Sequence, residues 1–289
     1  MKPAPFDYVA VSSLEEALSA LSEAGEGGKL LAGGQSLVPL LAFRLARPDV
    51  LIDVNGVPGL DGITVDDGRL RIGALTRHRA VERDPQVAAR FPLVSAAVAK
   101  IGHVAIRNRG TVGGSVAHAD PAAEWPALLL ALDGEAEVAG PRGRRVVAAA
   151  DLFESYLTTS LAPDEMICEI RGSLPPGSTG TSFIELARRD GDFAIVGVAV
   201  VLSIKTGEVR HCRISLSGVG GTPVRARAAE ESLVGTAAGT AEIEAAAAKV
   251  PDEITPSGDI HGSADYRRKV ARVLTRRALV AARNQIEVR

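Results

Sequence analysis

Two glycine-rich segments restrict the folds available to this chain more than any other feature of its sequence. The first, LLAGGQSLVPL (30–40), runs from an apolar stretch into a Gly-Gly pair followed by polar residues. The second, IRNRGTVGGSVAHADPAAEWP (106–126), places another Gly-Gly pair between hydroxyl residues. Paired glycines let backbone N–H groups approach an anion, and hydroxyls add donors. Together the segments could hold the two phosphates of a dinucleotide from opposite sides, although a Gly-Gly pair taken alone is more often simply a tight turn.

The common dinucleotide motifs are absent. Gly218-Val219-Gly220 continues as Gly-Thr-Pro and so does not complete GxGxxG, and the chain has no GxxxxGK[ST]. These motifs are typical of Rossmann and P-loop folds. A dinucleotide site in this chain would therefore belong to a different fold.

Composition narrows the possible partners. The 289 residues suggest two domains, or one with subdomains, and a net charge of −2 without long charge runs gives no sign of a nucleic-acid partner. We find no signal peptide and expect no transmembrane segment, which predicts a cytoplasmic protein, or one held at the inner face of a membrane through a larger complex. Cys168 and Cys212 lie in predicted strands, where buried thiols are expected, and the histidine and cysteine spacing predicts no metal site.

Secondary-structure signals indicate a mixed α+β chain. Ser12 and Ser13 precede Glu15 and Glu16 in two overlapping capping-box registers, and Gly25 can end the helix that follows. Strands are expected at 29–32, 50–54 and 70–75, and helices after a capping Thr76, at 92–101 and at 121–132. Further strands are expected at 135–140, 144–150 and 166–171, then a linker at 173–181, three strands (182–189, 194–204 and 209–219) and two helices (241–250 and 264–283).

AGGQSL with the downstream Pro39 and Arg44, then LIDV, then IRNRGTVGGSVAHADPAAE closely resemble the FAD-binding medium subunit of molybdenum hydroxylases. This family includes aerobic carbon monoxide dehydrogenases and xanthine-dehydrogenase-like enzymes, and the resemblance covers essentially the whole chain. It implies a two-subdomain FAD-binding fold of the vanillyl-alcohol-oxidase-like (PCMH) type over 1–173, with subdomains of about 1–55 and 56–173. A small βββαα domain over 174–289 completes the implied α+β architecture.

The resemblance also implies which residues contact FAD. The first segment would wrap the pyrophosphate through Ala32, Gly33, Gly34, Gln35 and Ser36, and the second would reach it through Thr111, Val112, Gly113, Gly114 and Ser115. Many relatives carry His in place of Gln35, and this difference leaves no obvious residue for a covalent link, so we expect non-covalent FAD. Relatives often have Asn or Asp in place of Ser115, which would weaken one contact here.

The resemblance implies a cofactor contact at several other positions, and some of these residues could instead have a purely structural role. Glu124 would accept hydrogen bonds from the sugar hydroxyls, or would simply complement a helix dipole. Ile101 and Ile167 would contact the cofactor or fill the core, and Phe193 would lie against the isoalloxazine ring or pack at a strand edge. Arg188 and Asp192 would line the polar edge of the flavin. Four further residues are predicted to be structural or on the surface: Trp125 in the core, Arg107 and Arg109 in solvent, and His118 without a partner.

The implied function is electron transfer within a heteromeric complex. A large subunit would carry molybdopterin, a small subunit would carry two [2Fe–2S] clusters, and the FAD here would pass electrons to an external acceptor. The assembly is expected to be a dimer of heterotrimers, with no catalytic acid, base or nucleophile in this chain. Two alternatives stay open: a stand-alone flavin oxidase, which would turn over substrate alone, and a binding module, which would lack flavin.

Overall fold

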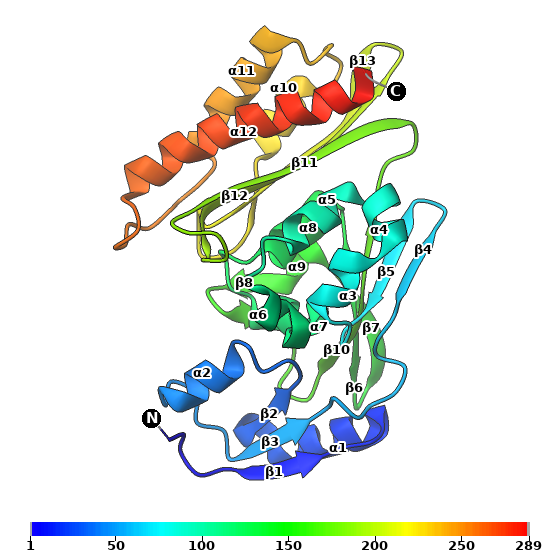
Figure 1. Cartoon of the computed structure of the whole chain (residues 1–289), viewed down its shortest axis with the longest axis vertical. Helices are drawn as coiled ribbons and strands as arrows, with labels where there is room; N and C mark the ends of the chain where they lie inside the picture. The colour runs from blue at the N-terminus through cyan, green and yellow to red at the C-terminus, as the bar shows by residue number, and fades with distance from the viewer. Residues whose placement is uncertain (1, 288–289) are drawn as a thin grey trace.

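The computed structural model describes residues 2–287, which form three layers along the long axis of the molecule (Figure 1). The N-terminal layer is a parallel sheet in the order β1-β3-β2. Because parallel neighbours need crossover connections, helices join these strands. The layer consists of β1 (Asp7–Ala10), α1 (Leu14–Ala24), a 3₁₀ turn (Gly25–Gly27), β2 (Gly28–Leu31), α2 (Leu37–Ala42) and β3 (Val50–Asp53).

Helix α1 begins in one of the two predicted capping registers. Ser13 Oγ accepts a hydrogen bond from the Glu16 N–H at 3.1 Å, and the Ser12 N–H donates to Glu16 Oε2 at 2.7 Å. The Ser12 backbone N–H and then the Ser12 hydroxyl, which both donate to the Glu16 carboxylate, lower the pKa of Glu16. Gly25 ends the helix with φ +53°, a value that glycine adopts without steric cost. The predicted cap and C-terminal glycine are thus confirmed.

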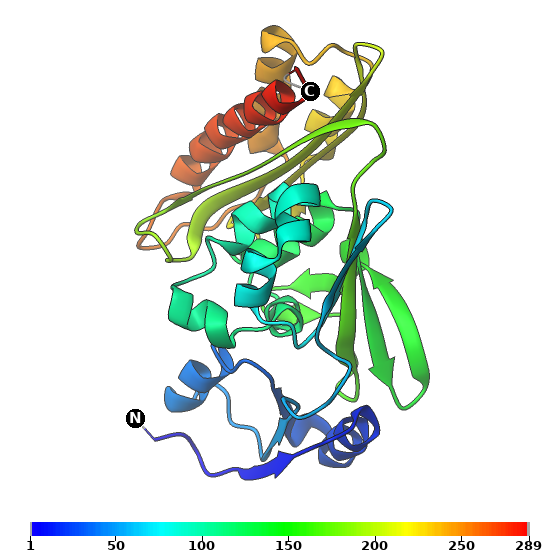
Figure 2. The same cartoon turned by 45° about the vertical axis from the view of Figure 1, so that its right-hand side comes forward.

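The middle layer is an antiparallel sheet in the order β4-β5-β10-β6-β7, with short helices gathered on one face (Figure 2). Helix α8 is buried along its whole length, and its Trp125 is only 1% exposed, which confirms the prediction of a core tryptophan. The layer consists of β4 (Ile63–Asp66), β5 (Arg69–Gly73), α3 (His78–Arg83), α4 (Pro85–Arg90), α5 (Pro92–Val98), α6 (Val104–Arg109), α7 (Val112–His118), α8 (Glu124–Ala131), β6 (Glu135–Gly140), β7 (Gly143–Ala148), α9 (Ala149–Leu152), β8 (Phe153–Ser155), β9 (Thr158–Thr159) and β10 (Met166–Ser173).

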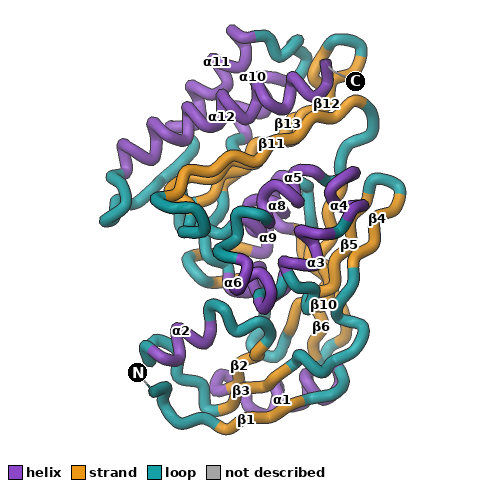
Figure 3. The backbone as a smooth tube through the Cα atoms, in the orientation of Figure 1, coloured by secondary structure: helices purple, strands orange, loops and turns teal. Residues whose placement is uncertain are grey.

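The C-terminal layer is an antiparallel sheet in the order β11-β12-β13-β14, covered on its outer face by helices (Figures 1 and 3). Strand β12 is buried on both faces, because Val198 and Val200 pack with the outer helices while Ala199 and Val201 join the core around α8. This explains its unbroken apolar run. The layer consists of β11 (Ser178–Ala187), β12 (Ala194–Lys205), β13 (Glu208–Ser217), β14 (Val224–Arg225), α10 (Arg227–Leu233), α11 (Thr240–Lys249), a 3₁₀ turn (Val250–Asp252) and α12 (Ala264–Glu287).

Several local predictions need correction. Thr76 does not cap α3: its hydroxyl binds Gly62 instead, accepting from the backbone N–H at 2.9 Å and donating to the carbonyl at 3.0 Å. The predicted linker 173–181 is shorter than expected, since β11 already begins at Ser178. A short fourth strand, β14, and the helix α10 extend the expected βββαα arrangement. Both thiols, Cys168 and Cys212, are buried as predicted.

Candidate functional site

A cavity of about 770 Å³ lies between the N-terminal and middle layers, and both glycine-rich segments line it. Its size is in the range of small-molecule and cofactor sites. The residues predicted to contact FAD in the two glycine-rich segments and at Ile101, Ile167 and Phe193 come from distant parts of the chain. The fold brings all of these but one to the cavity: Ala32, Gly33, Gly34, Gln35, Ser36, Ile101, Thr111, Gly113, Gly114, Ser115, Glu124, Ile167 and Phe193.

The first segment is the turn that leads from β2 into α2. Gly34 has φ +71°, a backbone conformation that favours glycine. The Gln35 Nε2 donates to the Gly33 carbonyl at 3.0 Å and so braces the turn from within. Over residues 2–287, no protein acceptor is found for the backbone N–H groups of Gly34, Gln35 and Ser36. This row of donors at the cavity wall is suited to an anion.

The two segments touch at Gly33. A Cβ at this position would lie 2.4 Å from the Arg109 carbonyl oxygen and 2.7 Å from the Gly110 Cα, which is closer than real side chains come. Any other residue would force the two backbones apart. Gly33 therefore sets how closely the first segment approaches the second.

The second segment differs from the first in how its N–H groups are used. Val112 and Gly113 donate to the carbonyls of Thr76 and Ala74 at 3.0 and 2.8 Å, and Gly114 donates to the Thr111 hydroxyl at 3.2 Å. The expectation that both Gly-Gly pairs turn their N–H groups toward an anion therefore holds only for the first pair. Hydroxyl groups remain the donors available from the second segment.

Gly114 supplies room at the cavity wall. A Cβ there would lie 2.7 Å from Thr111 Oγ1, while the next atom, the Ala32 Cβ, is 4.0 Å away. The residue itself is exposed to the cavity, and Ser115 beside it is partly exposed. Val112 is the predicted contact that does not line the cavity: its side chain is fully buried in the core, because the helix α7 turns it toward β5 and away from the opening. We therefore assign Val112 a packing role.

Glu124 is the buried carboxyl of the cavity. It is the first residue of α8 and is 5% exposed, and its carboxyl is hydrogen-bonded by its own backbone N–H but by no other residue of the described part of the chain. Burial, reinforced by the neighbouring Glu185 and Asp120, raises the pKa of Glu124 to about 8. Burial likewise raises the pKa of Glu185 to about 7. A buried acceptor of this kind needs donors, which the hydroxyl groups of a ligand could supply.

The remaining predicted residues divide between wall and rim. Ile101 and Ile167 line the cavity and also belong to the middle core, so both alternatives hold for them. Phe193 is 62% exposed at the cavity edge, which rules out the strand-edge core alternative, and Asp192 lies beside it. Arg188 does not line the cavity.

Two histidines line the cavity although the sequence did not single them out for it. His78 Nδ1 accepts a hydrogen bond from Trp125 Nε1 at 3.1 Å, and burial together with the charges of Arg107 and Arg77 lowers the pKa of His78 to about 4. His78 is therefore neutral, with Nε2 carrying its proton. His118 is partly exposed to the cavity, and its pKa is lowered mainly by burial. Neither lies in a pattern that sequence alone connects to a ligand.

Arg107 is buried, contrary to the expected solvent position. Its side chain is 9% exposed, and its Nε lies 2.9 Å from Glu82 Oε2. It also donates to the carbonyls of Ile101 and Gly102 at 3.0 and 2.7 Å. Both of these residues line the cavity, so Arg107 shapes the wall from behind.

Comparison with known families identifies the family of the chain. Residues 4–175 match the model of the FAD binding domain in molybdopterin dehydrogenase, and residues 181–282 match that of the CO dehydrogenase flavoprotein C-terminal domain. The chain belongs to the FAD-binding subunits of the molybdenum hydroxylases. It is therefore an oxidoreductase subunit, and FAD is the cofactor of its family.

Relatives and solved structures resemble the chain over nearly its full length. The 6-hydroxypseudooxynicotine dehydrogenase complex subunit alpha of Paenarthrobacter nicotinovorans is 42% identical over 98% of this chain and 96% of its own. The carbon monoxide dehydrogenase medium chain of Hydrogenophaga pseudoflava is 38% identical over 98% of both. A solved structure of that carbon monoxide dehydrogenase gives a TM-score of 0.96 at 40% identity, covering 99% of both chains. Quinoline 2-oxidoreductase from Pseudomonas putida 86 gives 0.92 at 37% identity, covering 98% of this chain and 99% of its own.

The residues present fit FAD. The cavity offers a row of backbone donors for phosphates, a wall at Gly114 from which any side chain would project into the cavity, and a buried carboxyl at Glu124. Among the lining residues described, Lys29 is the one lysine or arginine, so backbone dipoles supply most of the attraction for a diphosphate. Within residues 2–287 no helix is long and apolar enough to cross a membrane, and no cluster of candidate metal ligands is found.

Proposed function

We propose that the diphosphate of FAD lies between the two glycine-rich segments, bound non-covalently. The observation that carries this proposal is the row of N–H groups at Gly34, Gln35 and Ser36, which lack protein acceptors and line the same cavity as Thr111 and Ser115. Backbone donors from the first segment and hydroxyl donors from the second would then meet the phosphates. Both kinds of donor fit an anion that carries several acceptor oxygens.

The rest of the cavity suits the other parts of the cofactor. We assign Glu124 to the sugar hydroxyls, because its buried carboxyl lines the cavity and receives no hydrogen bond from another residue of the described part of the chain. The apolar walls at Ile101 and Ile167 and the rim residue Phe193 would contact the flexible chain and the ring system. No acid, base or nucleophile of this chain is assigned to substrate chemistry.

When bound, FAD supplies a centre that exchanges electrons singly or in pairs. We propose that this chain positions that centre to receive electrons from [2Fe–2S] clusters of a small partner subunit and to pass them to an external acceptor. A large molybdopterin subunit would oxidise the substrate. The relatives support this division, since chains of one fold serve enzymes named for a nicotine derivative, carbon monoxide and quinoline. Recognition of the substrate would then lie on another subunit.

We further propose the organisation of the chain and its assembly. An FAD-binding domain would span 1–173, with subdomains of about 1–55 and 56–173, and a second domain would span 174–289. The separate sheets and the two family matches support these boundaries. The complex would be a dimer of heterotrimers acting in the cytoplasm.

The Gly114→Val variant tests the position of the cofactor. The added Cβ would lie 2.7 Å from Thr111 Oγ1, so the Thr111 side chain must shift and the valine methyl groups would enter the cavity. The purified variant should retain less than a tenth of the FAD of the wild type while melting within a few degrees of it. Gly221→Val is the matched control, because a Cβ at Gly221 meets nothing closer than a backbone nitrogen at 4.0 Å. A Gly114→Val protein saturated with FAD would refute the proposed position.

A further inference from the structure

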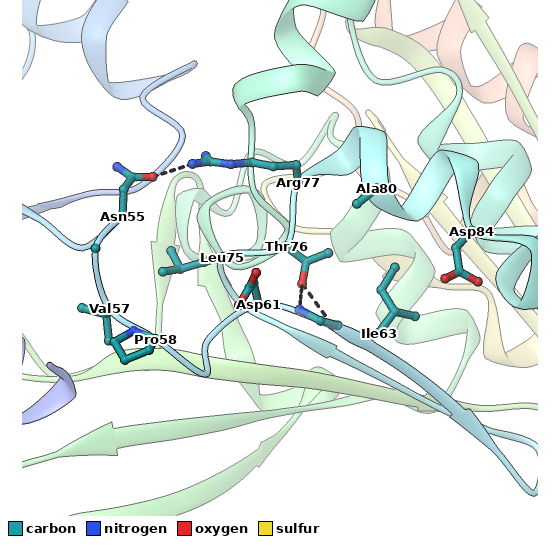
Figure 4. A pocket seen from close by; sticks show the side chains of 12 residues that line it. Asn55, Val57, Pro58, Asp61, Ile63, Leu75, Thr76, Arg77, Ala80 and Asp84 are labelled. Carbon is teal, nitrogen blue, oxygen red and sulfur yellow. Dashed lines mark hydrogen bonds between the residues drawn. The ribbon is translucent and has the colours of Figure 1, made fainter. Parts of the chain in front are cut away.

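A chain of polar side chains joins the N-terminal layer to the middle layer behind the flavin cavity (Figure 4). Tyr8 Oη on β1 donates to Asp53 Oδ2 at 2.6 Å. Asp53 Oδ1 in turn accepts from the Asn55 backbone N–H at 2.9 Å and from Asn55 Nδ2 at 2.6 Å. These bonds fix the orientation of the Asn55 amide, whose Oδ1 accepts from Arg77 Nη2 at 2.6 Å. Figure 4 shows the Asn55 and Arg77 side chains reaching toward each other.

Each of the two central residues also holds the backbone of one glycine-rich segment. Asn55 Nδ2 donates to the carbonyl of Ala32 at 2.9 Å, directly before the first Gly-Gly pair. Arg77 Nη1 donates to the carbonyl of Arg109, directly before the second segment turns into α7. That same Arg109 carbonyl is the atom against which Gly33 packs. A single hydrogen bond, Asn55 Oδ1 to Arg77 Nη2, therefore connects the fixing points of both segments.

Neither residue touches the cavity itself. Asn55 and Arg77 instead line a neighbouring pocket of about 540 Å³, which shares Leu75 with the cavity. The guanidinium suits this position because its planar fork presents several N–H donors in fixed directions, so one side chain can hold two acceptors at once. An ammonium group lacks this geometry.

We propose that Asn55 and Arg77 form a clamp that sets the separation of the two glycine-rich segments and thereby positions them to bind FAD. They are positioning residues, acting through the Ala32 and Arg109 carbonyls. The inference rests on the proposed place of FAD between the segments. The close packing at Gly33 prevents the segments from closing further, whereas the hydrogen bonds of Asn55 and Arg77 to the two carbonyls oppose their opening.

The test compares FAD affinity with stability in the full-length chain. Asn55→Ala and Arg77→Gln should each weaken FAD binding about tenfold, because each breaks the charge-assisted hydrogen bond between Asn55 and Arg77 together with the bond that its residue makes to a segment carbonyl. The double variant should be no weaker than the worse single variant, since both changes open the same clamp. Arg77→Lys should resemble Arg77→Gln. Arg83→Gln is the matched control: it removes an exposed arginine from α3 that has no partner among the described residues.

Three measurements decide the outcome: the FAD dissociation constant, the ADP dissociation constant and the melting temperature of the apo chain. The clamp predicts that FAD and ADP affinities fall together, because both ligands carry a diphosphate, while the melting temperature stays within a few degrees. If the Asn55 and Arg77 variants melt at a lower temperature but bind FAD and ADP as tightly as the wild type, these residues only stabilise the fold and the proposal is overturned. Additive losses in the double variant would also overturn it. Wild-type affinity in all Asn55 and Arg77 variants would refute the clamp but leave the proposed position of FAD standing. FAD retention by Gly114→Val would instead refute the proposed position of the cofactor.

Discussion

Replacing Glu124 by Gln removes a buried carboxyl group that titrates in the flavin cavity. The pKa of Glu124 is about 8 in the folded chain, against an ordinary value of 4.5. The folded state therefore binds the proton more tightly, so its contribution to stability is complete below pH 4.5 and is lost as the pH rises through 8. Proton linkage over these two values gives a loss of about 3 kcal/mol between pH 5.5 and pH 8.5. Gln resembles the protonated carboxyl in size and carries no titration.

The assay is urea unfolding of the FAD-free chain at pH 5.5 and 8.5, followed by fluorescence. Trp125 is the single tryptophan and lies next to Glu124 in the buried helix α8, so its emission reports on this region. The wild type should lose about 3 kcal/mol more than Glu124→Gln over this pH range. Glu154→Gln, which removes an exposed carboxyl, is the control and should behave like the wild type.

Two results test the raised pKa of Glu124 and its assignment to the sugar hydroxyls. Parallel pH dependence in wild type and Glu124→Gln, within about 0.5 kcal/mol, would refute the raised pKa. The assignment of Glu124 to the sugar hydroxyls gives a second prediction. Hydrogen-bond donors to a carboxylate favour its ionised form, so bound FAD should lower the pKa of Glu124. Binding of FAD at pH 7 should therefore release a proton, seen in calorimetry as a dependence on the ionisation heat of the buffer. This release should be absent in Glu124→Gln.

Two further predictions concern packing and the thiols. Gly33→Ala places a methyl group 2.4 Å from the Arg109 carbonyl, so it should cost about 1–3 kcal/mol in thermal unfolding and weaken FAD binding; an unchanged melting temperature would contradict the contact between the two segments. Cys168 and Cys212 are buried, and burial raises the pKa of both thiols. Both should resist iodoacetamide in the native chain and react after unfolding, as counted by mass spectrometry, and rapid native labelling would argue against the packing described here.

Local sequence patterns predicted the structure correctly where an element depends on residues that are close together in the chain. The Ser13–Glu16 cap and the apolar run of β12 each depend on residues close together in the chain. The sequence did not reveal β1, whose residues are all exposed and which is held by backbone pairing to β3. Its strand state depends on a partner more than 40 residues away, a dependence that no local pattern records.

The site shows the same division. The glycine-rich segments are recognisable by composition, and the fold brings them together as expected. Which N–H groups remain available could not be predicted, because Val112 and Gly113 donate to the carbonyls of Thr76 and Ala74, which follow β5, and that pairing exists only in the folded chain. The burial of Arg107 follows from its ion pair with Glu82, which lies on another helix. The burial and the hydrogen-bond partners of such residues are determined by tertiary contacts.

The central claim is that this chain holds FAD non-covalently between its glycine-rich segments. The most direct measurement is the visible absorption spectrum of the purified wild-type and Gly114→Val chains, with the cofactor released by acid and identified by chromatography. The wild type should show oxidised-flavin bands and release FAD in a one-to-one ratio, and the variant should be colourless. A colourless wild type that takes up no added FAD, or cofactor that stays attached to the acid-precipitated protein, would contradict the account.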